Sequence, residues 1–293
     1  MVSDISLVRE LIALRALHSD ASLNARRMQY DRAEVSFEND SPPPGPPVNA
    51  DGCAAEWVLK PPADSVVLYV HGGGYLLGSA RSHRHLSAAI GRASKSGVLA
   101  VDYRLAPEHP FPAAVEDTVA ACRWLLKQNY RVFLAGDSAG GGLVVATLVS
   151  VRGDTRRPAG AICLSPWVDL TCQGESHRLR ATRDPLLETY ELRSMATQYL
   201  GGADPRHPLA SPIFADLTGL PPMLAMVGSD EILFDDARAL VNAWRGAGGV
   251  AELQEWAGMI HVWPWWFPVL DEGRRAIAKM GQFITNPSAH AVT

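Results

Sequence analysis

The chain has no apolar stretch long enough to cross a membrane as a helix, and its first residues lack the apolar core of a signal peptide. We therefore expect no membrane span and a cytoplasmic location. No long basic run occurs and the net charge is -4 at pH 7, so nucleic acid is not an expected partner. The four cysteines show no C-x-x-C spacing, which predicts free thiols rather than disulfides.

Internal repeats are also absent, and the only low-complexity stretch is the proline-rich run 42–47, which predicts a stiff extended link. Helical periodicity precedes this run, over about 5–16 and 21–37. The 47% apolar and 20% charged residues of the 293-residue chain are typical of a globular protein with a sizeable core. Such a length fits one large α/β domain or two smaller ones.

After the proline run, short apolar segments alternate with helical ones. This pattern predicts a mostly parallel central sheet flanked by helices, with ligands at the carboxyl ends of the strands. The pattern loosens between about 172 and 212, where a helix at roughly 186–199 lies among polar loops, and we interpret this segment as an insertion. Strands are expected at 56–59, 66–70, 98–101, 132–135, 161–164, 223–227 and 251–256.

One strand-to-helix junction carries the clearest chemical signal. Gly136-Asp137-Ser138-Ala139-Gly140 follows the expected strand 132–135 and precedes a small, apolar helical segment. A G-x-S-x-G pattern in this context is typical of a nucleophile elbow, a tight turn whose glycines avoid a clash. The sequence therefore predicts Ser138 as a nucleophile, with the amide of Ala139 at a helix N-terminus that favours negative charge.

A serine nucleophile needs a base and an acid that orients it, in the chain order Ser, Asp or Glu, His. His261 is the histidine that follows a late strand, and Asp230 lies just after the strand 223–227. Asp235 and Asp236 compete for the role of acid, and an Asp before a helix is often only an N-cap. We prefer Asp230 because it is nearer to the strand end.

His71-Gly72-Gly73-Gly74 follows directly on the strand 66–70. Glycines allow the backbone to approach a ligand and to aim its amides at it, so Gly73, Gly74 and Ala139 are the expected oxyanion donors. The alternative is a phosphate-binding loop, but the segment lacks both the Lys-Ser/Thr of a P-loop and a G-x-G-x-x-G pattern. We expect His71 to hold this loop through a hydrogen bond rather than to transfer protons.

Several motifs in one order resemble the hormone-sensitive-lipase-like (bacterial type IV) esterases. They are HGGGY at 71–75, DYRLAPEHPFPAA at 102–114, GDSAGG at 136–141, SPWVDLT at 165–171, the Asp230 segment and His261. The resemblance implies a single α/β-hydrolase domain over 1–293. It also implies a helical cap formed by about 1–45 and about 172–212.

Carried over by position, the resemblance assigns Ser138 as nucleophile, His261 as base, Asp230 as its orienter, and Gly73, Gly74 and Ala139 as the oxyanion hole. One departure stands out. The family often has Asp-Pro-Leu at the catalytic acid, whereas Asp230 is followed by Glu231-Ile232-Leu233.

These residues predict a carboxylesterase that acts on short- to medium-chain acyl esters through an acyl-enzyme, without metal or cofactor. A lactone hydrolase is an alternative, because residues 255–263 are similar to epsilon-lactone hydrolases of this family. An amidase or acyltransferase, and a small-ligand receptor like the gibberellin receptors, are others, although those receptors lack the histidine. The expected partner is a small-molecule ester or lactone, and a homodimer is compatible with the sequence. The candidate pocket residues are Tyr75, Leu76, Leu77, Trp167, Leu186, Leu187, Trp263, Trp265 and Trp266.

Overall fold

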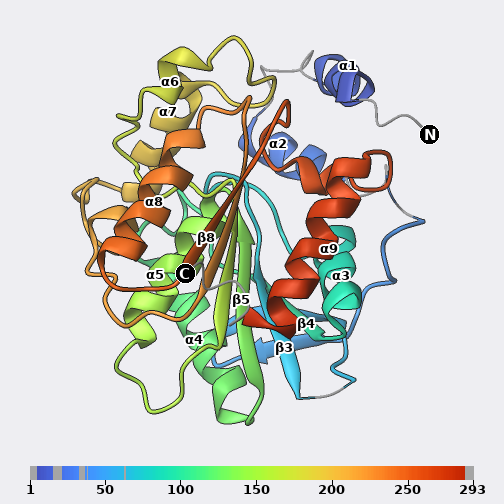
Figure 1. The fold of residues 1–293 in the computed structure, drawn as a ribbon, viewed down its shortest axis with the longest axis vertical. Coiled ribbons are helices and arrows are strands. Elements are labelled where there is room, and N and C mark those ends of the chain that lie inside the picture. Colours follow the sequence, from blue (N-terminus) through green and yellow to red (C-terminus); the bar gives the residue numbers. More distant parts are fainter. Residues whose placement is uncertain (1–4, 16–21, 33–36, 38, 63, 288–293) are drawn as a thin grey trace.

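The protein is built around one central sheet (Figure 1). The computed structural model describes the chain except for residues 1–4, 16–21, 33–36, 38, 63 and 288–293. The sheet order is β1-β2-β4-β3-β5-β6-β7-β8; β2 is antiparallel to β1 and β4, and the pairs from β4 to β8 are parallel. The strands are β1 (Pro47–Ala50), β2 (Cys53–Leu59), β3 (Ser65–Val70), β4 (Gly97–Asp102), β5 (Arg131–Asp137), β6 (Gly160–Leu164), β7 (Met223–Gly228) and β8 (Ala251–Trp256).

The predicted mostly parallel sheet is thus confirmed, but its first hairpin was not foreseen. β1 begins at Pro47, where the proline-rich run ends, and β2 begins three residues earlier than expected. Asp51 and Gly52 join these strands with φ angles of 59° and 101°. A tight hairpin turn needs such positive φ values, and Asp-Gly adopts them readily.

Helices cover both faces of the sheet. α3 (Arg84–Ser94) and α9 (Asp271–Thr285) lie on one side, and α4 (Ala113–Lys127), α5 (Ala139–Val151) and α8 (Phe234–Gly246) on the other (Figure 1). Alternate residues of β3 enter different cores, Val66 and Leu68 on the α4–α5 side and Val67 and Tyr69 on the α3–α9 side. Burial on both faces explains why the strand reads as a continuous apolar run.

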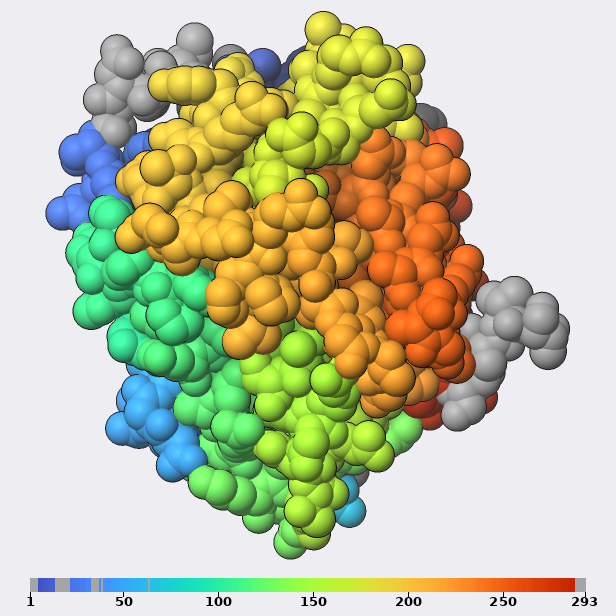
Figure 2. Space-filling view, turned by 90° about the vertical axis from the view of Figure 1, so that its left-hand side faces the viewer, coloured from blue at the N-terminus to red at the C-terminus, as the bar shows by residue number. Residues whose placement is uncertain are grey.

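The remaining helices lie beyond the carboxyl ends of the parallel strands (Figure 1). They come from two distant parts of the sequence: α1 (Ile5–Arg15) and α2 (Leu23–Arg32), and then α6 (Ser176–Leu179) and α7 (Thr189–Leu200). In Figure 2 the segment 172–212, yellow to gold, covers the upper part of the face in view. Of the predicted helix at 21–37, α2 covers Leu23–Arg32, and residues 21 and 33–36 lie outside the described part of the chain.

Arg27 fixes α2 to the loops below it. Its guanidinium donates to the carbonyl oxygens of Leu76 and Ala106, each at 2.8 Å, and to both carboxylate oxygens of Glu108. Ala106 and Glu108 belong to the segment 102–114 that the motif analysis singled out, and Leu76 directly follows the HGGGY segment at 71–75. The planar fork of an arginine suits several acceptors at once, so α2 is held over the strand ends.

All four cysteines are buried free thiols, and Cys163 lies in β6, within the core. Burial raises the pKa of the Cys163 thiol to about 12, consistent with packing rather than chemistry. Among the described helices, none has the length and apolar character needed to span a bilayer.

Candidate active site

The turn between β5 and α5 holds Ser138 in a backbone conformation that residues other than glycine rarely adopt. Its φ is 54° and its ψ is -123°, so the turn is strained. A Cβ at Gly140 would lie 2.1 Å from the carbonyl oxygen of Val70, and one at Gly136 would lie 2.6 Å from the carbonyl oxygen of Gly140. Both positions therefore require glycine, as the sequence predicts. The turn places Ser138 at the wall of a cavity.

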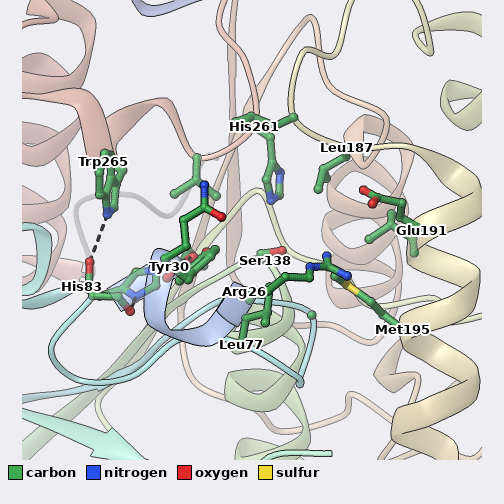
Figure 3. A pocket seen from close by; sticks show the side chains of 18 of the residues that line it. Arg26, Tyr30, Leu77, His83, Ser138, Leu187, Glu191, Met195, His261 and Trp265 are labelled. Atoms are coloured by element: carbon green, nitrogen blue, oxygen red, sulfur yellow. Dashed lines mark hydrogen bonds and ion pairs between the residues drawn. The ribbon is translucent and has the colours of Figure 1, made fainter. Parts of the chain in front are cut away.

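A buried histidine–carboxylate pair lies at the same cavity. His261 follows β8 and lines the cavity together with Ser138, and its ring points toward Ser138 (Figure 3). Its Nδ1 donates to Glu231 Oε2 at 2.7 Å. The side chain of Glu231 is fully buried and that of His261 is 8% exposed. Because Nδ1 carries the proton of this hydrogen bond, Nε2 of the neutral ring is the atom available as a base.

Glu231 is itself held on its other oxygen. Oε1 accepts from Ser165 Oγ at 2.8 Å and from the backbone amide of Gly228 at 2.6 Å. The same Ser165 hydroxyl accepts from the amide of Val262, the residue after His261, at 3.0 Å. The acid and the histidine loop are thus fixed to one another, and the buried charge has a full set of donors.

The prediction that Asp230 orients His261 is wrong. Asp230 is paired with Arg9 of α1, 2.8 Å away, and its side chain is 22% exposed. The neighbouring Glu231 occupies the position beside the imidazole instead. Consecutive side chains in the turn after β7 point in different directions. The Asp230 side chain therefore reaches an ion pair near the surface, whereas that of Glu231, one residue later, reaches the buried histidine.

One signal in the sequence could have identified Glu231. In the family pattern Asp-Pro-Leu, the acid precedes a leucine by two positions. Glu231-Ile232-Leu233 keeps this spacing, whereas Asp230 does not. The apparent departure after Asp230 is therefore a shift of the acid by one residue, with glutamate in place of aspartate. The competing candidates Asp235 and Asp236 accept hydrogen bonds from backbone amides instead. Asp235 accepts from the amide of Ser176, and Asp236 accepts from those of Val168 and Asp169.

Burial is the largest single influence on the pKa of His261 and lowers it, whereas the hydrogen bond and the negative charge of Glu231 raise it. The carboxylates of Asp184 and Asp137 act in the same direction, and the net pKa lies above the usual value of histidine. The environment therefore stabilises the imidazolium form that a base acquires when it takes a proton.

The HGGG segment follows β3 and borders the same cavity. Gly73 has a φ of 115° and Gly74 a φ of 62°, and both line the cavity with Ser138. A Cβ at Gly74 would lie 2.3 Å from the sulfur of Met195 in α7. The glycines thus permit both the positive φ angles and a close approach to α7. Ala139 is fully buried at the first position of α5.

His71 supports this loop, as expected. Burial lowers the pKa of His71 to about 3, so the ring is neutral at ordinary pH. Its Nδ1 donates to the carbonyl oxygen of Gly72 at 2.7 Å. Its ring stacks on Tyr103 at 4.2 Å between centroids, and the Tyr103 hydroxyl donates to the carbonyl oxygen of His71. The residue holds the loop and takes no part in the pair with Glu231.

The cavity has a volume of about 370 Å³ and lies between the strand ends and the helices above them. α2 contributes polar side chains to it, whereas α7 and the loop before it contribute mainly leucines and a methionine. Figure 3 shows these side chains converging from opposite sides. Its lining comprises Arg26, Gln29, Tyr30, Gly73, Gly74, Leu77, Ser82, His83, Asp137, Ser138, Leu186, Leu187, Glu191, Leu192, Met195, His261, Val262, Trp265 and Trp266.

The predicted pocket residues divide into two groups. Leu77, Leu186, Leu187, Trp265 and Trp266 line the cavity. The others do not line it, and they are packed in the interior at 2% exposure or less: Tyr75, Leu76, Trp167 and Trp263. Tyr75, for example, stacks on Tyr199 of α7 at 3.7 Å between ring centroids. Aromatic composition alone could not separate a cavity wall from the core beneath it.

The cavity also contains residues that the sequence analysis did not single out, among them Arg26, Tyr30, His83 and Met195. Arg26 and Tyr30 lie on α2 and Met195 lies on α7, far from the predicted motifs in the chain, whereas His83 directly precedes α3 and follows the HGGGY segment closely. No local pattern marks the first three, because the folding of α2 and α7 over the strand ends brings them to the site.

Asp184 links the pocket wall to the acid loop. Its carboxylate accepts from the amides of Leu186 and Leu187 and, on its other oxygen, from the amide of Ile232 at 2.9 Å. Ile232 is the residue after Glu231. The segment that carries the two leucines is therefore joined to the loop of Glu231 through Asp184, by two hydrogen bonds within the segment and one to the amide of Ile232.

The chain is similar in sequence to known proteins. Residues 67–264 match a family described as having the alpha/beta hydrolase fold. An acetyl-hydrolase of Streptomyces hygroscopicus is 54% identical over 96% of each chain. An esterase of Acinetobacter venetianus is 33% identical over 82% of this chain and 81% of its own.

Solved structures agree with these relatives. The crystal structure of an esterase from the bacterial hormone-sensitive lipase family is 46% identical, covers 96% of both chains and superposes with a TM-score of 0.90. We conclude that the chain belongs to the alpha/beta hydrolase family and is a carboxylesterase of the hormone-sensitive-lipase-like group.

Proposed function

We propose that the protein hydrolyses short- to medium-chain acyl esters through a Ser138–His261–Glu231 triad and an acyl-enzyme. The observation that carries this proposal is the buried Glu231–His261 hydrogen bond of 2.7 Å at the wall of the cavity that also contains Ser138. The strained backbone at Ser138 supports it, because this geometry is typical of a nucleophile elbow.

In the first step, Ser138 Oγ attacks the ester carbonyl carbon while His261 Nε2 takes the hydroxyl proton. The negative oxygen of the tetrahedral intermediate accepts hydrogen bonds from the amides of Gly73, Gly74 and Ala139. Collapse breaks the bond to the alcohol, which leaves with the proton from the imidazolium. Glu231 keeps the imidazole in the required tautomer and stabilises its charged form.

In the second step, water attacks the acyl-enzyme and His261 takes a proton from it. The second tetrahedral intermediate releases the carboxylic acid, and Ser138 recovers its proton. Every step uses side chains or backbone amides of this chain, with water as the co-substrate.

The substrate range follows from the cavity. Its volume of about 370 Å³ is at the lower end for ligand sites, and leucine and methionine side chains of the α7 region line one wall. The acetyl-hydrolase of Streptomyces hygroscopicus, 54% identical, is consistent with a small acyl group. We propose that α1, α2 and the segment 172–212 form the cap of this cavity.

Substitution of Ser138 tests the mechanism. We expect Ser138→Ala to lower kcat for p-nitrophenyl acetate and butyrate by at least about 10⁴-fold, because the nucleophile is lost. Ser150→Ala is the matched control, since Ser150 Oγ donates within α5 to the carbonyl oxygen of Ala146 and lies outside the cavity lining. Intact-mass measurement after treatment with a p-nitrophenyl phosphonate should show one adduct on the wild type and none on Ser138→Ala. Retained turnover in that variant would exclude the proposed mechanism.

A further inference from the structure

Asp137 precedes Ser138 in the chain, but the triad leaves it without a role. Its side chain is 2% exposed and lines the catalytic cavity. Burial raises the pKa of this carboxyl, but the charge of His83 and the hydrogen bonds from His83 and Tyr69 lower it by more, and the net pKa lies below its ordinary value. A buried charge is unfavourable unless it is paired and hydrogen-bonded, so the groups that hold this carboxylate matter.

The contacts of this carboxylate join the two segments that supply the oxyanion donors. Asp137 Oδ1 accepts from the backbone amide of Gly72 at 3.1 Å. Gly72 immediately precedes Gly73 and Gly74, whereas Asp137 lies two residues before Ala139. A Cβ at Gly72 would lie 2.2 Å from Asp137 Oδ2, so this approach is possible only at a glycine.

Two further groups hold the carboxylate in place. The Tyr69 hydroxyl donates to Oδ1 at 2.7 Å, and His83 Nε2 lies 3.3 Å from Oδ2. Ser82 Oγ, 2.9 Å from Nδ1 of His83, fixes the ring of that histidine. Tyr69 is in β3 and His83 directly precedes α3, so the carboxylate is anchored to rigid elements.

We propose that Asp137 is a positioning residue of the oxyanion hole: its carboxylate fixes the Gly72–Gly74 segment relative to Ala139. The inference rests on the proposed acyl-transfer function. Consecutive glycines impose little conformational restriction, so the amides of Gly73 and Gly74 need an external tether to remain aimed at one point. Preorganised donors stabilise the oxyanion because they are already directed at it before the reaction. A displacement of about 1 Å can cost on the order of 10²-fold in rate.

The affinity for a transition-state analogue distinguishes this positioning role from a purely structural one. We compare Asp137→Ala with Asp137→Asn, measuring kcat/KM for p-nitrophenyl butyrate, Ki for an alkyl trifluoromethyl ketone, and Tm. The ketone forms a tetrahedral oxyanion with the serine. We expect Asp137→Ala to lower kcat/KM by about 10- to 100-fold and to weaken ketone binding by a similar factor. The amide oxygen of Asp137→Asn still accepts from Gly72, so this variant should remain within about 5-fold of wild type.

Asp102→Ala provides a matched control. Asp102 also ends a strand and accepts one loop amide, that of Ala80, but it does not line the cavity. We expect unchanged kcat/KM and unchanged ketone affinity in this variant. Should Asp137→Ala not fold, Tyr69→Phe removes one donor to the carboxylate and is expected to lower both quantities in parallel, by about 3- to 10-fold.

The inference is overturned if a folded Asp137→Ala, or Tyr69→Phe in its place, keeps wild-type kcat/KM, or loses turnover without a matching loss of ketone affinity. Loss of Tm alone would show a structural role only. Ser138→Ala is assayed alongside: if that variant is active, the proposed function fails, and if it is inactive while Asp137→Ala is fully active, only the present inference fails.

Discussion

Asp230 and Glu231 are consecutive in the chain, yet their carboxylates pair with side chains from distant segments, Arg9 and His261 respectively. Asp230 forms an ion pair with Arg9 of α1 at 2.8 Å, whereas Glu231 accepts from His261 Nδ1 at 2.7 Å. Arg9 also donates to the carbonyl oxygen of Arg183, which precedes Asp184. Arg9 therefore joins α1 both to the turn after β7, through Asp230, and to the segment above the cavity, through Arg183, whereas Glu231 is paired with His261.

This relationship predicts a clear difference between two neighbouring substitutions. Glu231→Gln removes the carboxylate beside His261 and is expected to lower kcat by about 10³- to 10⁴-fold, as loss of the orienting acid does in other triads. Asp230→Asn breaks a partly exposed ion pair of small energetic value, about 1 kcal/mol or less, and should leave kcat within a few fold. Steady-state kinetics with p-nitrophenyl butyrate distinguish them. A larger loss in Asp230→Asn would restore Asp230 as the acid.

The raised pKa of His261 predicts the pH dependence of the esterase. The base must be neutral to accept the serine proton, so kcat/KM should fall as the pH decreases through the pKa of His261. Because Glu231 raises this pKa, the midpoint should lie above the model-peptide value of about 6.5. In Glu231→Gln, burial remains as the dominant influence and the midpoint should move to lower pH.

Profiles of kcat/KM between about pH 5 and 9 at constant ionic strength measure these midpoints. Asp230→Asn serves as the control, with an unchanged midpoint expected. A midpoint that is the same in wild type and Glu231→Gln would contradict the assignment of Glu231 as the partner of His261.

The elbow glycines predict a large effect of a single methyl group. In Gly140→Ala, the new Cβ would approach the carbonyl oxygens of Val70 and His71 at 2.1 and 2.6 Å, and both are backbone atoms that cannot rotate away. We expect the free energy of unfolding to decrease by about 1–3 kcal/mol or more, with loss of esterase activity.

The control is Gly153→Ala. Gly153 has open space around its Cβ position, so the expected change is within about 0.5 kcal/mol. Urea unfolding, followed by circular dichroism, measures both variants. Equal stability of the two variants would mean that the β5–α5 turn does not require the close approach.

The apolar wall predicts how acyl-chain preference can be changed. Leu187→Trp places a larger side chain in the cavity of about 370 Å³. We expect the ratio of kcat/KM for p-nitrophenyl hexanoate to that for acetate to fall by about 10-fold or more, because small volume changes in a pocket are worth about 1–3 kcal/mol. Tyr190→Trp is the control, since Tyr190 is 80% exposed and lies outside the cavity lining. An unchanged ratio in Leu187→Trp would mean that the acyl chain binds elsewhere.

The sequence by itself determined the parts of the protein that depend on local geometry. Ser138 with Gly136 and Gly140 forms a turn whose requirements extend over only a few residues, so the motif identifies it. The positions of Gly73 and Gly74 after β3, and of His261 after β8, follow in the same way from the alternation of strands and helices. The parallel sheet then brings the ends of these strands to one edge.

Only the tertiary structure decided which carboxylate reaches His261 and which side chains face the cavity. A turn directs successive side chains along different vectors, so proximity in the chain could not separate Asp230 from Glu231. Likewise, Trp167 and Trp263 are as apolar as Trp265, but the first two are buried in the core and the last lines the cavity. Such distinctions depend on how α2 and α7 pack over the strand ends, and these contacts join residues far apart in the chain, such as Arg27 with Glu108 and Met195 with Gly74, which no local pattern encodes.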